Sequence, residues 1–172
     1  MSGLIRSHVH PHRRLAFTLV EAVISTIIVS VMLVAALSTA GASRLIQYKV
    51  SLSNHGRLLA EQLLAEVVQH DYQDANESIV FGPEADESAA TRADFDDVDD
   101  YNGWSAGPPV AKEGAELANV TGWQRTVTVQ WVDPLDTTQV EASETGAKRI
   151  TVTASHNNMP QATLVCIRTA HQ

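Results

Sequence analysis

The chain has 172 residues and a formal net charge of −8 at pH 7, from 12 lysines and arginines against 20 aspartates and glutamates. This length allows one modest hydrophobic core, and the acidic balance argues against a nucleic-acid-binding module that relies on a basic patch. A single cysteine, Cys166, cannot form a disulfide within the chain, so packing or another interaction must hold the folded part together.

Residues 1–16 are predicted to be a basic leader peptide. They contain Arg6, Arg13 and Arg14 and no acidic residue. A secretory signal peptide also begins basic and then turns apolar, but its apolar core has about 7 to 15 residues and ends at a small-residue cleavage site. The apolar run that follows here is longer and has a glutamate, Glu21, at its beginning. The leader is therefore unlike that of an ordinary secreted protein.

Residues 17–43 are predicted to be a transmembrane helix. No charged residue occurs from Ala22 to Ser43, and this run exceeds the roughly 20 residues that a helix needs to cross the hydrocarbon core. A lone span must satisfy its backbone groups internally, so we expect a helix in spite of its many β-branched residues. Three arginines precede the span, whereas Arg44 and Lys49 follow it. This bias favours a single-pass protein with a cytoplasmic N-terminus and a head outside the inner membrane, in the periplasm.

Glu21 lies near the start of the span, where a carboxylate is costly. An acidic residue in a membrane segment is a functional candidate that needs a partner. One interpretation is that the carboxylate only reaches the headgroup level. The other interpretation requires a positively charged group on another molecule.

The start of the span resembles the class III signal of type IV pilins and of the pseudopilins of the type II secretion system. In that family a basic leader ends in Gly, and a motif like FTLIE and an unbroken apolar helix follow. Here Arg13 and Arg14 supply the basic end, residues 17–21 read FTLVE, and Ala16 stands in place of the Gly.

This resemblance implies prepilin-type N-terminal cleavage and methylation. A prepilin peptidase would cut between Ala16 and Phe17 and methylate the new amino group of Phe17. Glu21 would pair with the amino terminus of a neighbouring subunit during filament assembly. The resemblance also implies a pilin-like α+β fold, in which a long N-terminal helix, transmembrane and then amphipathic, packs on a small C-terminal antiparallel β-sheet.

Residues 44–73 are expected to continue the helix as an amphipathic segment. Apolar residues recur along it at spacings of seven or four and form a stripe that must be covered: Leu45, Leu52, Leu59, Leu63 and Val67, widened by Leu64 and Val68. Gly56 weakens the helix by about 1 kcal/mol and is a candidate flexible point. The alternative to packing on the head is a coiled-coil or dimerisation stalk.

Residues 74–109 are predicted to be an acidic connecting loop, because glycines and prolines interrupt any long element. Hard oxygen ligands close to a glycine suit Ca²⁺, which makes six side chains candidate metal ligands: Asp94, Asp96, Asp97, Asp99, Asp100 and Asn102. The EF-hand spacing is missing. The competing interpretation is a solvated acidic loop without a cofactor, anchored on the head by Phe95, Tyr101 and Trp104.

Residues 110–172 are the predicted β-sheet head. Residues 123–131 alternate apolar and polar side chains as a half-buried strand does, and residues 149–155 and 162–169 are further strands. We expect a three-stranded antiparallel meander whose apolar face packs on the second half of the helix. Arg125 interrupts that face and is expected at its rim. The contiguous apolar residues of the last strand predict cover on both of its faces.

The sequence contains no G-x-S-x-G, H-E-x-x-H, Walker or dinucleotide-binding motif, so we predict no enzymatic activity. Together with the resemblance, it predicts a minor pilin-like or pseudopilin subunit of a type IV pilus or a type II secretion filament; a DNA-uptake filament would share its features. Its expected partners are other such subunits, the prepilin peptidase, the inner-membrane assembly platform and membrane lipid, with no nucleic acid. Two alternatives remain: an unprocessed membrane-anchored binding protein, and a calcium-dependent or hydrolytic head on a membrane stalk.

Overall fold

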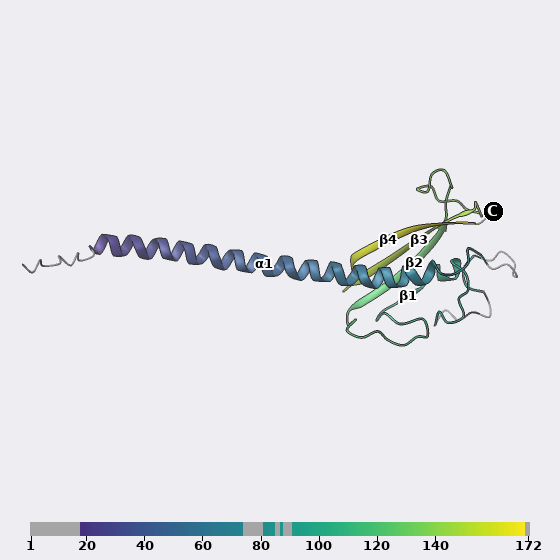
Figure 1. The fold of residues 1–172 in the computed structure, drawn as a ribbon, viewed down its shortest axis with the longest axis horizontal. Helices are drawn as coiled ribbons and strands as arrows, with labels where there is room; N and C mark the ends of the chain where they lie inside the picture. Colours follow the sequence, from purple (N-terminus) through teal and green to yellow (C-terminus); the bar gives the residue numbers. More distant parts are fainter. Residues whose placement is uncertain (1–17, 74–80, 85–86, 88–90, 171–172) are drawn as a thin grey trace, which may run out of the picture. The chain divides into compact units, whose positions relative to one another are not determined.

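The computed structural model of the protein describes residues 18–73, 81–84, 87 and 91–170 (Figure 1). These residues form helix α1 (Leu19–Val67), the short 3-10 helix η1 (Asp99–Tyr101), and strands β1 (Ser105–Ala106), β2 (Trp123–Trp131), β3 (Ala147–His156) and β4 (Met159–Thr169). The chain divides into two compact units between Ile46 and Gln47, within α1. The layout is α+β, with one long N-terminal helix and an antiparallel sheet.

The first unit contains the apolar half of α1. The amide of Glu21 donates a hydrogen bond to Thr18 Oγ1 at 3.3 Å. Thr18 and Glu21 have the spacing of a capping box, in which the hydroxyl at the N-cap accepts from the amide three residues later. Further along, the Ser30 hydroxyl donates to the carbonyl of Thr26 at 2.7 Å. Hydroxyl side chains of this segment are thus satisfied by the backbone of their own helix.

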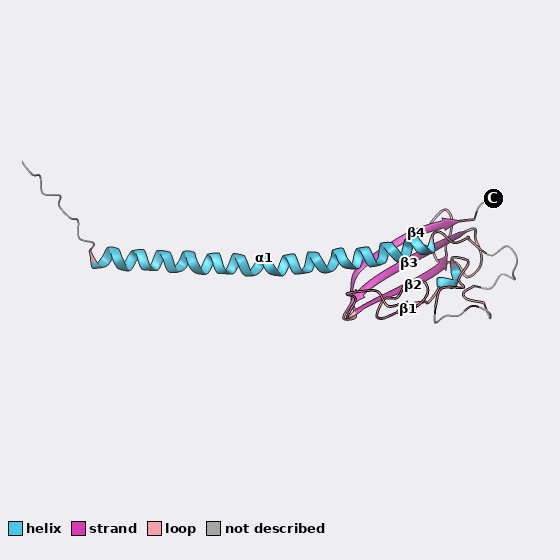
Figure 2. Cartoon of the chain, turned by 60° about the horizontal axis from the view of Figure 1, so that its bottom comes forward, coloured by secondary structure: helices cyan, strands magenta, loops and turns pink. Residues whose placement is uncertain are grey.

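The second half of α1 packs on one face of the sheet (Figure 1, Figure 2). Its buried residues are Gly56, Leu59, Ala60, Leu63 and Val67, with Leu52, Leu64 and Val68 partly buried beside them. The predicted apolar stripe is confirmed for this part of the helix. After Val67 the amides of Gln69 and His70 bond to carbonyls only three residues earlier, so the last turn tightens and the helix ends.

The sheet has the order β1-β2-β3-β4, and each neighbouring pair is antiparallel. The boundaries predicted for β2 are confirmed. Asn157 and Asn158 join β3 to β4 with φ values of 49° and 63°, as a two-residue hairpin with a type I′ turn requires. The prediction of three strands was wrong, because β1 adds a fourth. β1 has only two residues and no alternation, so no sequence pattern indicates it.

β4 is covered on one face only, so the prediction of cover on both faces was wrong for the described residues. Val165 is 57% exposed and Ile167 is 37% exposed, whereas Leu164 packs against the core. Alternate residues of a strand point to opposite faces, and α1 covers only one of them. The other face of the sheet is mostly polar on β2, where Gln124, Thr126 and Thr128 alternate with buried residues.

Gly56 is a packing position rather than a flexible point. α1 runs through it without interruption. A Cβ added there would lie 2.8 Å from the Cβ of Gln161 on β4 and 3.1 Å from Cζ3 of Trp123 on β2. The missing side chain therefore lets the helix approach the sheet closely.

Gly56→Ala should lower the thermal stability of the protein. Alanine gains about 1 kcal/mol of helix propensity, but overpacking of the helix against the sheet costs about 1–3 kcal/mol. Thermal unfolding of the purified full-length chain in detergent, followed by circular dichroism, measures the balance. Gly41→Ala in the same helix is the control, because no atom lies within 4 Å of an added Cβ there, and it should leave the midpoint unchanged or raise it. A Gly56→Ala midpoint at or above that of Gly41→Ala would contradict the close contact.

Candidate functional site

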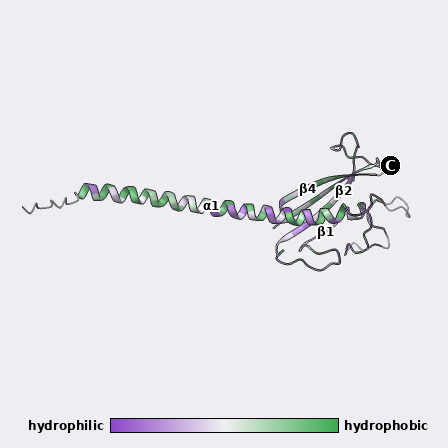
Figure 3. Cartoon of the chain, viewed as in Figure 1, coloured by the Kyte–Doolittle hydropathy of each residue, from purple (hydrophilic) through white to green (hydrophobic). Residues whose placement is uncertain are grey.

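The surface of α1 in the first unit is exposed and apolar, and it requires an apolar partner or lipid to cover it. Every residue from Leu19 to Ile46 is exposed. The large apolar side chains among them are Leu19, Val20, Val23, Ile24, Ile27, Ile28, Val29, Val31, Met32, Leu33, Val34, Leu37, Leu45 and Ile46. Figure 3 shows hydrophobic residues along most of this half of α1, whereas hydrophilic residues interrupt them in the other half.

This surface is long and apolar enough to cross a membrane. Soluble monomers rarely expose more than a few hundred Å² of contiguous apolar surface. A helix that is hydrophobic on all sides is normally buried in a protein core or in lipid. The first half of α1 is thus a candidate membrane span, by its length and composition.

Glu21 is the only charged residue between Thr18 and Ser43. It lies in the first turn of α1, where a carboxylate interacts favourably with the positive end of the helix dipole. None of the ion pairs among the described residues includes it. The predicted cleavage and methylation site, Ala16 and Phe17, lies outside the described residues.

The acidic loop places its six candidate ligands in different environments. Asp94 and Asp96 are exposed, whereas Asp97, Asp99 and Asp100 are buried. The side chain of Asn102 is hydrogen-bonded to the sheet, because its Oδ1 accepts from the amide of Val129 at 3.0 Å. The predicted anchors are confirmed, because Phe95, Tyr101 and Trp104 all belong to the hydrophobic core.

The buried aspartates shape the chain around η1. Asp97 Oδ1 accepts from the amides of Asp99 at 2.7 Å and Asp100 at 3.4 Å. Asp100 Oδ2 accepts from the amides of Asp96 at 3.0 Å and Asp97 at 2.9 Å. Asp99 forms a buried ion pair with Lys148 on β3. These carboxylates therefore act first as local hydrogen-bond acceptors and as the link between η1 and the sheet.

Asp100 also belongs to a group of three carboxylates that includes two residues not predicted as ligands. Glu84, Glu87 and Asp100 each place one carboxylate oxygen so that all three oxygens lie within 4.8 Å of one another. Burial is the largest of the causes that raise the pKa of Glu87 to about 8; the side chains of Glu84 and Asp100 also raise this pKa, and a hydrogen bond with the Glu84 backbone lowers it. Burial together with Asp99 and Asp100 raises the pKa of Asp97 to about 7. Each of these carboxylates, when it is ionised, therefore disfavours the ionised form of its neighbours.

A second charged cluster joins α1 to the loop and the sheet. The guanidinium of Arg92 donates from Nε to Glu66 Oε1 at 2.7 Å and from Nη2 to Glu66 Oε2 at 3.0 Å. Arg92 is fully buried and lies 4.1 Å above the ring of Trp104. The hydroxyl of Tyr101 donates to Glu66 Oε1 at 3.1 Å. This bidentate pair is of the geometrically specific kind that arginine forms with carboxylates.

Arg125 lies in the core beside this cluster, so its predicted place at the rim was wrong. Its side chain is 1% exposed. Backbone carbonyls satisfy part of the guanidinium, because it donates to the oxygens of Leu59 and Val110. Burial and the charge of Arg92 lower the pKa of Arg125 to about 10, against the opposing charge of Glu66. An arginine inside an apolar strand face thus becomes tolerable through carbonyl acceptors that only the folded chain provides.

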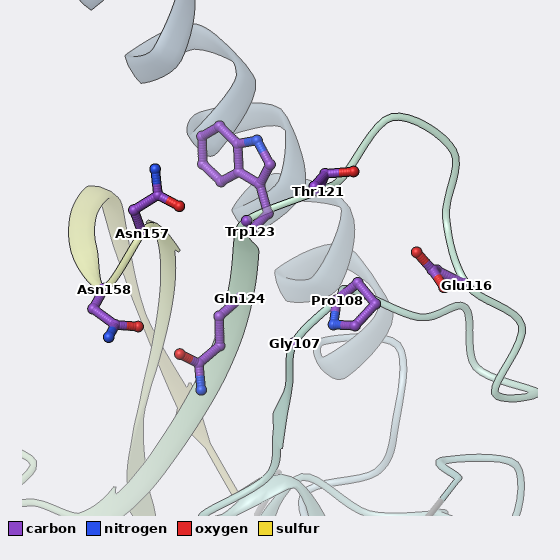
Figure 4. A pocket seen from close by; sticks show the side chains of 9 residues that line it. Gly107, Pro108, Glu116, Thr121, Trp123, Gln124, Asn157 and Asn158 are labelled. Carbon is purple, nitrogen blue, oxygen red and sulfur yellow. The ribbon is translucent and has the colours of Figure 1, made fainter.

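A surface cavity of about 700 Å³ lies at the ends of β2 and β3 (Figure 4). It is lined by Gly107, Pro108, Glu116, Thr121, Gly122, Trp123, Gln124, Asn157 and Asn158. Figure 4 shows the carboxylate of Glu116 on the far side of the cavity from Asn157 and Asn158. Its lining residues place no base beside a nucleophile, so this cavity does not support a catalytic role.

Comparison with protein families, curated proteins and solved structures found no match for this chain. The functional proposal consequently depends on the motif and on the physical chemistry of the described residues.

Glu66→Gln should weaken the fold near neutral pH and flatten its acid sensitivity. Burial alone would raise the pKa of Glu66, but Arg92 and the Tyr101 hydroxyl outweigh it and hold the pKa below its ordinary value of 4.5. The stabilisation is therefore fully present above pH 4.5 and is lost as the pH falls through the folded-state pKa. We expect a loss of about 1.5–3 kcal/mol at pH 7, measured by urea unfolding between pH 3 and pH 7.

Glu61→Gln is the matched control on the same helix. Glu61 pairs with Arg57 on the surface, where both side chains are substantially exposed. Exposed pairs contribute little, so the unfolding midpoint and its pH profile should remain close to those of the unmodified chain. Parallel acid profiles for Glu66→Gln and the unmodified chain would show that the Glu66 pair is weak.

Proposed function

We propose that this protein is a minor pilin-like or pseudopilin subunit, made as an inner-membrane protein and drawn into a filament of a type IV pilus or a type II secretion system. The observation that carries the proposal is the exposed apolar surface of α1 from Leu19 to Ile46, which begins within the FTLVE motif. Such a surface requires an apolar environment before and after assembly.

The same surface fits both environments. Before assembly, the segment is long enough to span the bilayer, and four of its hydroxyl groups bond to its own backbone. After assembly, apolar helices of neighbouring subunits take the place of lipid around it. A helix with a single apolar stripe would suit only one partner face, whereas this one is apolar on all sides. The proposed mechanism is thus assembly rather than catalysis.

The carboxylate of Glu21 gives the assembly its charge pairing. An unpaired carboxylate in a low-dielectric bundle is costly. Cleavage after Ala16 would create a positively charged amino group at Phe17, four residues before Glu21. In a bundle of staggered subunits, the amino group of one chain compensates Glu21 of its neighbour and fixes the axial register between them.

The folded head supports the proposal at a coarser level. A single-layer antiparallel sheet packs on the second half of α1 and leaves its other face exposed. This layout fits the pilin-like arrangement that the motif implies. In the proposed topology the N-terminus is cytoplasmic and the head is periplasmic until the subunit enters the filament.

The second candidate function is an unprocessed, membrane-anchored binding protein. The observation that favours it is Ala16, which stands where the family has glycine before the cleavage point. Intact mass and N-terminal sequencing of the protein from membranes of cells that contain a prepilin peptidase separate the two. A chain that begins at methylated Phe17 supports the filament subunit, and a chain that retains Arg13 and Arg14 supports the anchor.

Glu21→Ala should leave membrane insertion intact and reduce incorporation into filaments. The substitution removes the carboxylate that neutralises a neighbouring amino terminus, and the loss of a charged hydrogen bond of about 1.5 kcal/mol corresponds to roughly tenfold less incorporation. The measurement compares the protein in carbonate-washed membranes with the protein in sheared filaments, in cells that express the partner subunits.

Thr26→Val is the control in the same helix. It removes a hydroxyl that donates to the carbonyl of Val23 at 2.8 Å and changes no charge, so incorporation should be unaffected. Equal incorporation of the Glu21→Ala protein and this control would refute the charge-pairing role of Glu21.

A further inference from the structure

The connection between β2 and β3, residues 132–146, is long for two neighbouring strands of an antiparallel sheet. Hairpin loops usually have about two to five residues, and long connections without helices or strands are usually either functional or disordered. This loop is ordered by hydrogen bonds. Asp133 Oδ1 accepts from the amide of Leu135 at 2.7 Å, and Arg149 on β3 donates to the carbonyl of Thr137 at 3.0 Å. Its order therefore favours a function.

Asp136 fixes the tip of this loop. Its Oδ1 accepts from the amide of Thr138 at 3.1 Å and from the hydroxyl of Thr138 at 2.6 Å, and its Oδ2 accepts from the side-chain amide of Gln139 at 3.0 Å. The hydrogen bonds from Thr138 and Gln139 lower the pKa of Asp136 below its ordinary value. Asp136 is also exposed. The loop thus presents a fixed negative charge to the solvent at neutral pH.

Leu135 lies at the same tip and is 97% exposed. A single exposed apolar side chain is ordinary on a protein surface. Leu135 differs because its backbone is already fixed, and a group held in place before association loses less conformational freedom when it binds. The loop contains no lysine or arginine, and its four acidic residues are Asp133, Asp136, Glu141 and Glu144. It therefore fits an apolar surface that carries basic residues.

The second half of α1 has such a surface on the face opposite the sheet. Val50 is 52% exposed, Leu58 is 63% exposed, and the Arg57 side chain is 68% exposed. Their spacing of seven and eight residues places them on one side of the helix, and together they are called the outer stripe here. From Gln47 to Ala60, the lysines and arginines are Lys49 and Arg57, and no acidic residue occurs.

Arg57 keeps donors for another molecule. Among the described residues, its guanidinium bonds only to Glu61, through Nε at 2.7 Å. An exposed pair of this kind is weak. The remaining N–H groups of Arg57 can therefore meet a carboxylate of a second copy while Glu61 stays in place.

The loop and the outer stripe lie at opposite ends of the head. The stripe is level with the start of β2, because a Cβ added at Gly56 would lie 3.1 Å from Trp123. The loop follows the end of β2, and next to it Lys148 donates to the carbonyl of Tyr72, beyond the end of α1. The nine residues of β2 separate the two surfaces by about 30 Å at about 3.3 Å per residue. A contact between them therefore joins two copies head to tail.

We propose that the β2–β3 loop of one copy docks on the outer stripe of a second copy of this chain, with Leu135 between Val50 and Leu58. Asp136 and Glu141 then face the basic residues of the helix. Two different surfaces make this contact heterologous, so it repeats in one direction without closing. Every copy keeps the same orientation, as helices anchored in one membrane must. This inference rests on the proposed function and specifies how neighbouring heads meet.

Cross-linking of the full-length chain tests the contact in cells that express the partner subunits and a prepilin peptidase. In a Cys166→Ser background, Thr137→Cys and Asn54→Cys place thiols beside Leu135 and between Val50 and Leu58. A short bismaleimide should then produce a ladder of dimers, trimers and larger species, in membranes and in sheared filaments. Each cysteine variant alone should remain monomeric, because the contact is not symmetric.

Two further variants examine what holds the contact. Leu135→Asp places a charge in the apolar contact and should abolish the ladder, while its exposure leaves the unfolding midpoint unchanged. Arg57→Gln should lower the yield of the ladder up to about fivefold, the limit for an exposed charge pair. An NaCl concentration of about 1 M should have a similar effect, because it screens exposed charges.

Met159→Cys in place of Asn54→Cys is the matched control, since Met159 is 67% exposed and lies outside the outer stripe. An equal ladder from this control would overturn the proposal, as would dimers of the Thr137→Cys variant alone or its cross-link to another subunit. An undiminished ladder from Leu135→Asp would also overturn it.

The same cells separate this contact from the proposed function. Filaments that contain the chain but yield no ladder would overturn the contact and leave the proposed function intact. A chain that is absent from filaments but forms the ladder in membranes would support the contact and contradict the proposed function. Absence of the chain from filaments and of the ladder from membranes would overturn both.

Discussion

The first half of α1 depends on one constraint: an apolar surface that surrounds a helix must be kept from water. From Leu19 to Ile46 the part of the chain that the structure describes leaves this surface exposed. Four of its hydroxyl side chains, those of Thr26, Ser30, Ser38 and Thr39, bond to carbonyls about one turn earlier, so these groups make no polar demand on their surroundings. Lipid and other apolar helices satisfy the constraint equally well. This property suits the proposed transfer of the helix from a membrane to a helical bundle.

The second half of α1 satisfies the same constraint in a different way. Here the apolar residues narrow to a stripe, and the sheet covers it. Gly56 shows how closely the two surfaces approach, because even one added methyl group would meet the side chains of Gln161 and Trp123. The charged pair between Glu66 and Arg92 then fixes the loop against the polar edge of the helix. One continuous helix therefore has two different surfaces, an exposed one from Leu19 to Ile46 and a stripe covered by the sheet further along, and the change of pattern along its sequence encodes the difference.

Sequence pattern predicted what depends on periodicity. The long helix, the stripe from Leu59 to Val67 and the limits of β2 follow from local spacing, and the structure has them. Sequence pattern did not predict the features that depend on contacts between residues far apart in the sequence. β1 is too short to carry an alternation, and Arg125 is buried because the carbonyls of Leu59 and Val110 reach it. The hydrogen bond from the amide of Glu21 to Thr18 Oγ1 has a local signal, because a T-x-x-E spacing is typical of a helix start. The grouping of Glu84 and Glu87 with Asp100 has none, since only folding brings them together.

The acidic residues of the chain divide by what their oxygens contact. Asp97 and Asp99 are occupied by backbone amides or by Lys148, and Glu66 by Arg92, so these acids build the head. Glu21 differs from these acids, because it lies on an apolar helix and none of the ion pairs among the described residues includes it. A buried or membrane-embedded carboxylate is too costly to persist without compensation. In the proposed assembly, the positively charged amino terminus of a neighbouring subunit would supply this compensation at Glu21.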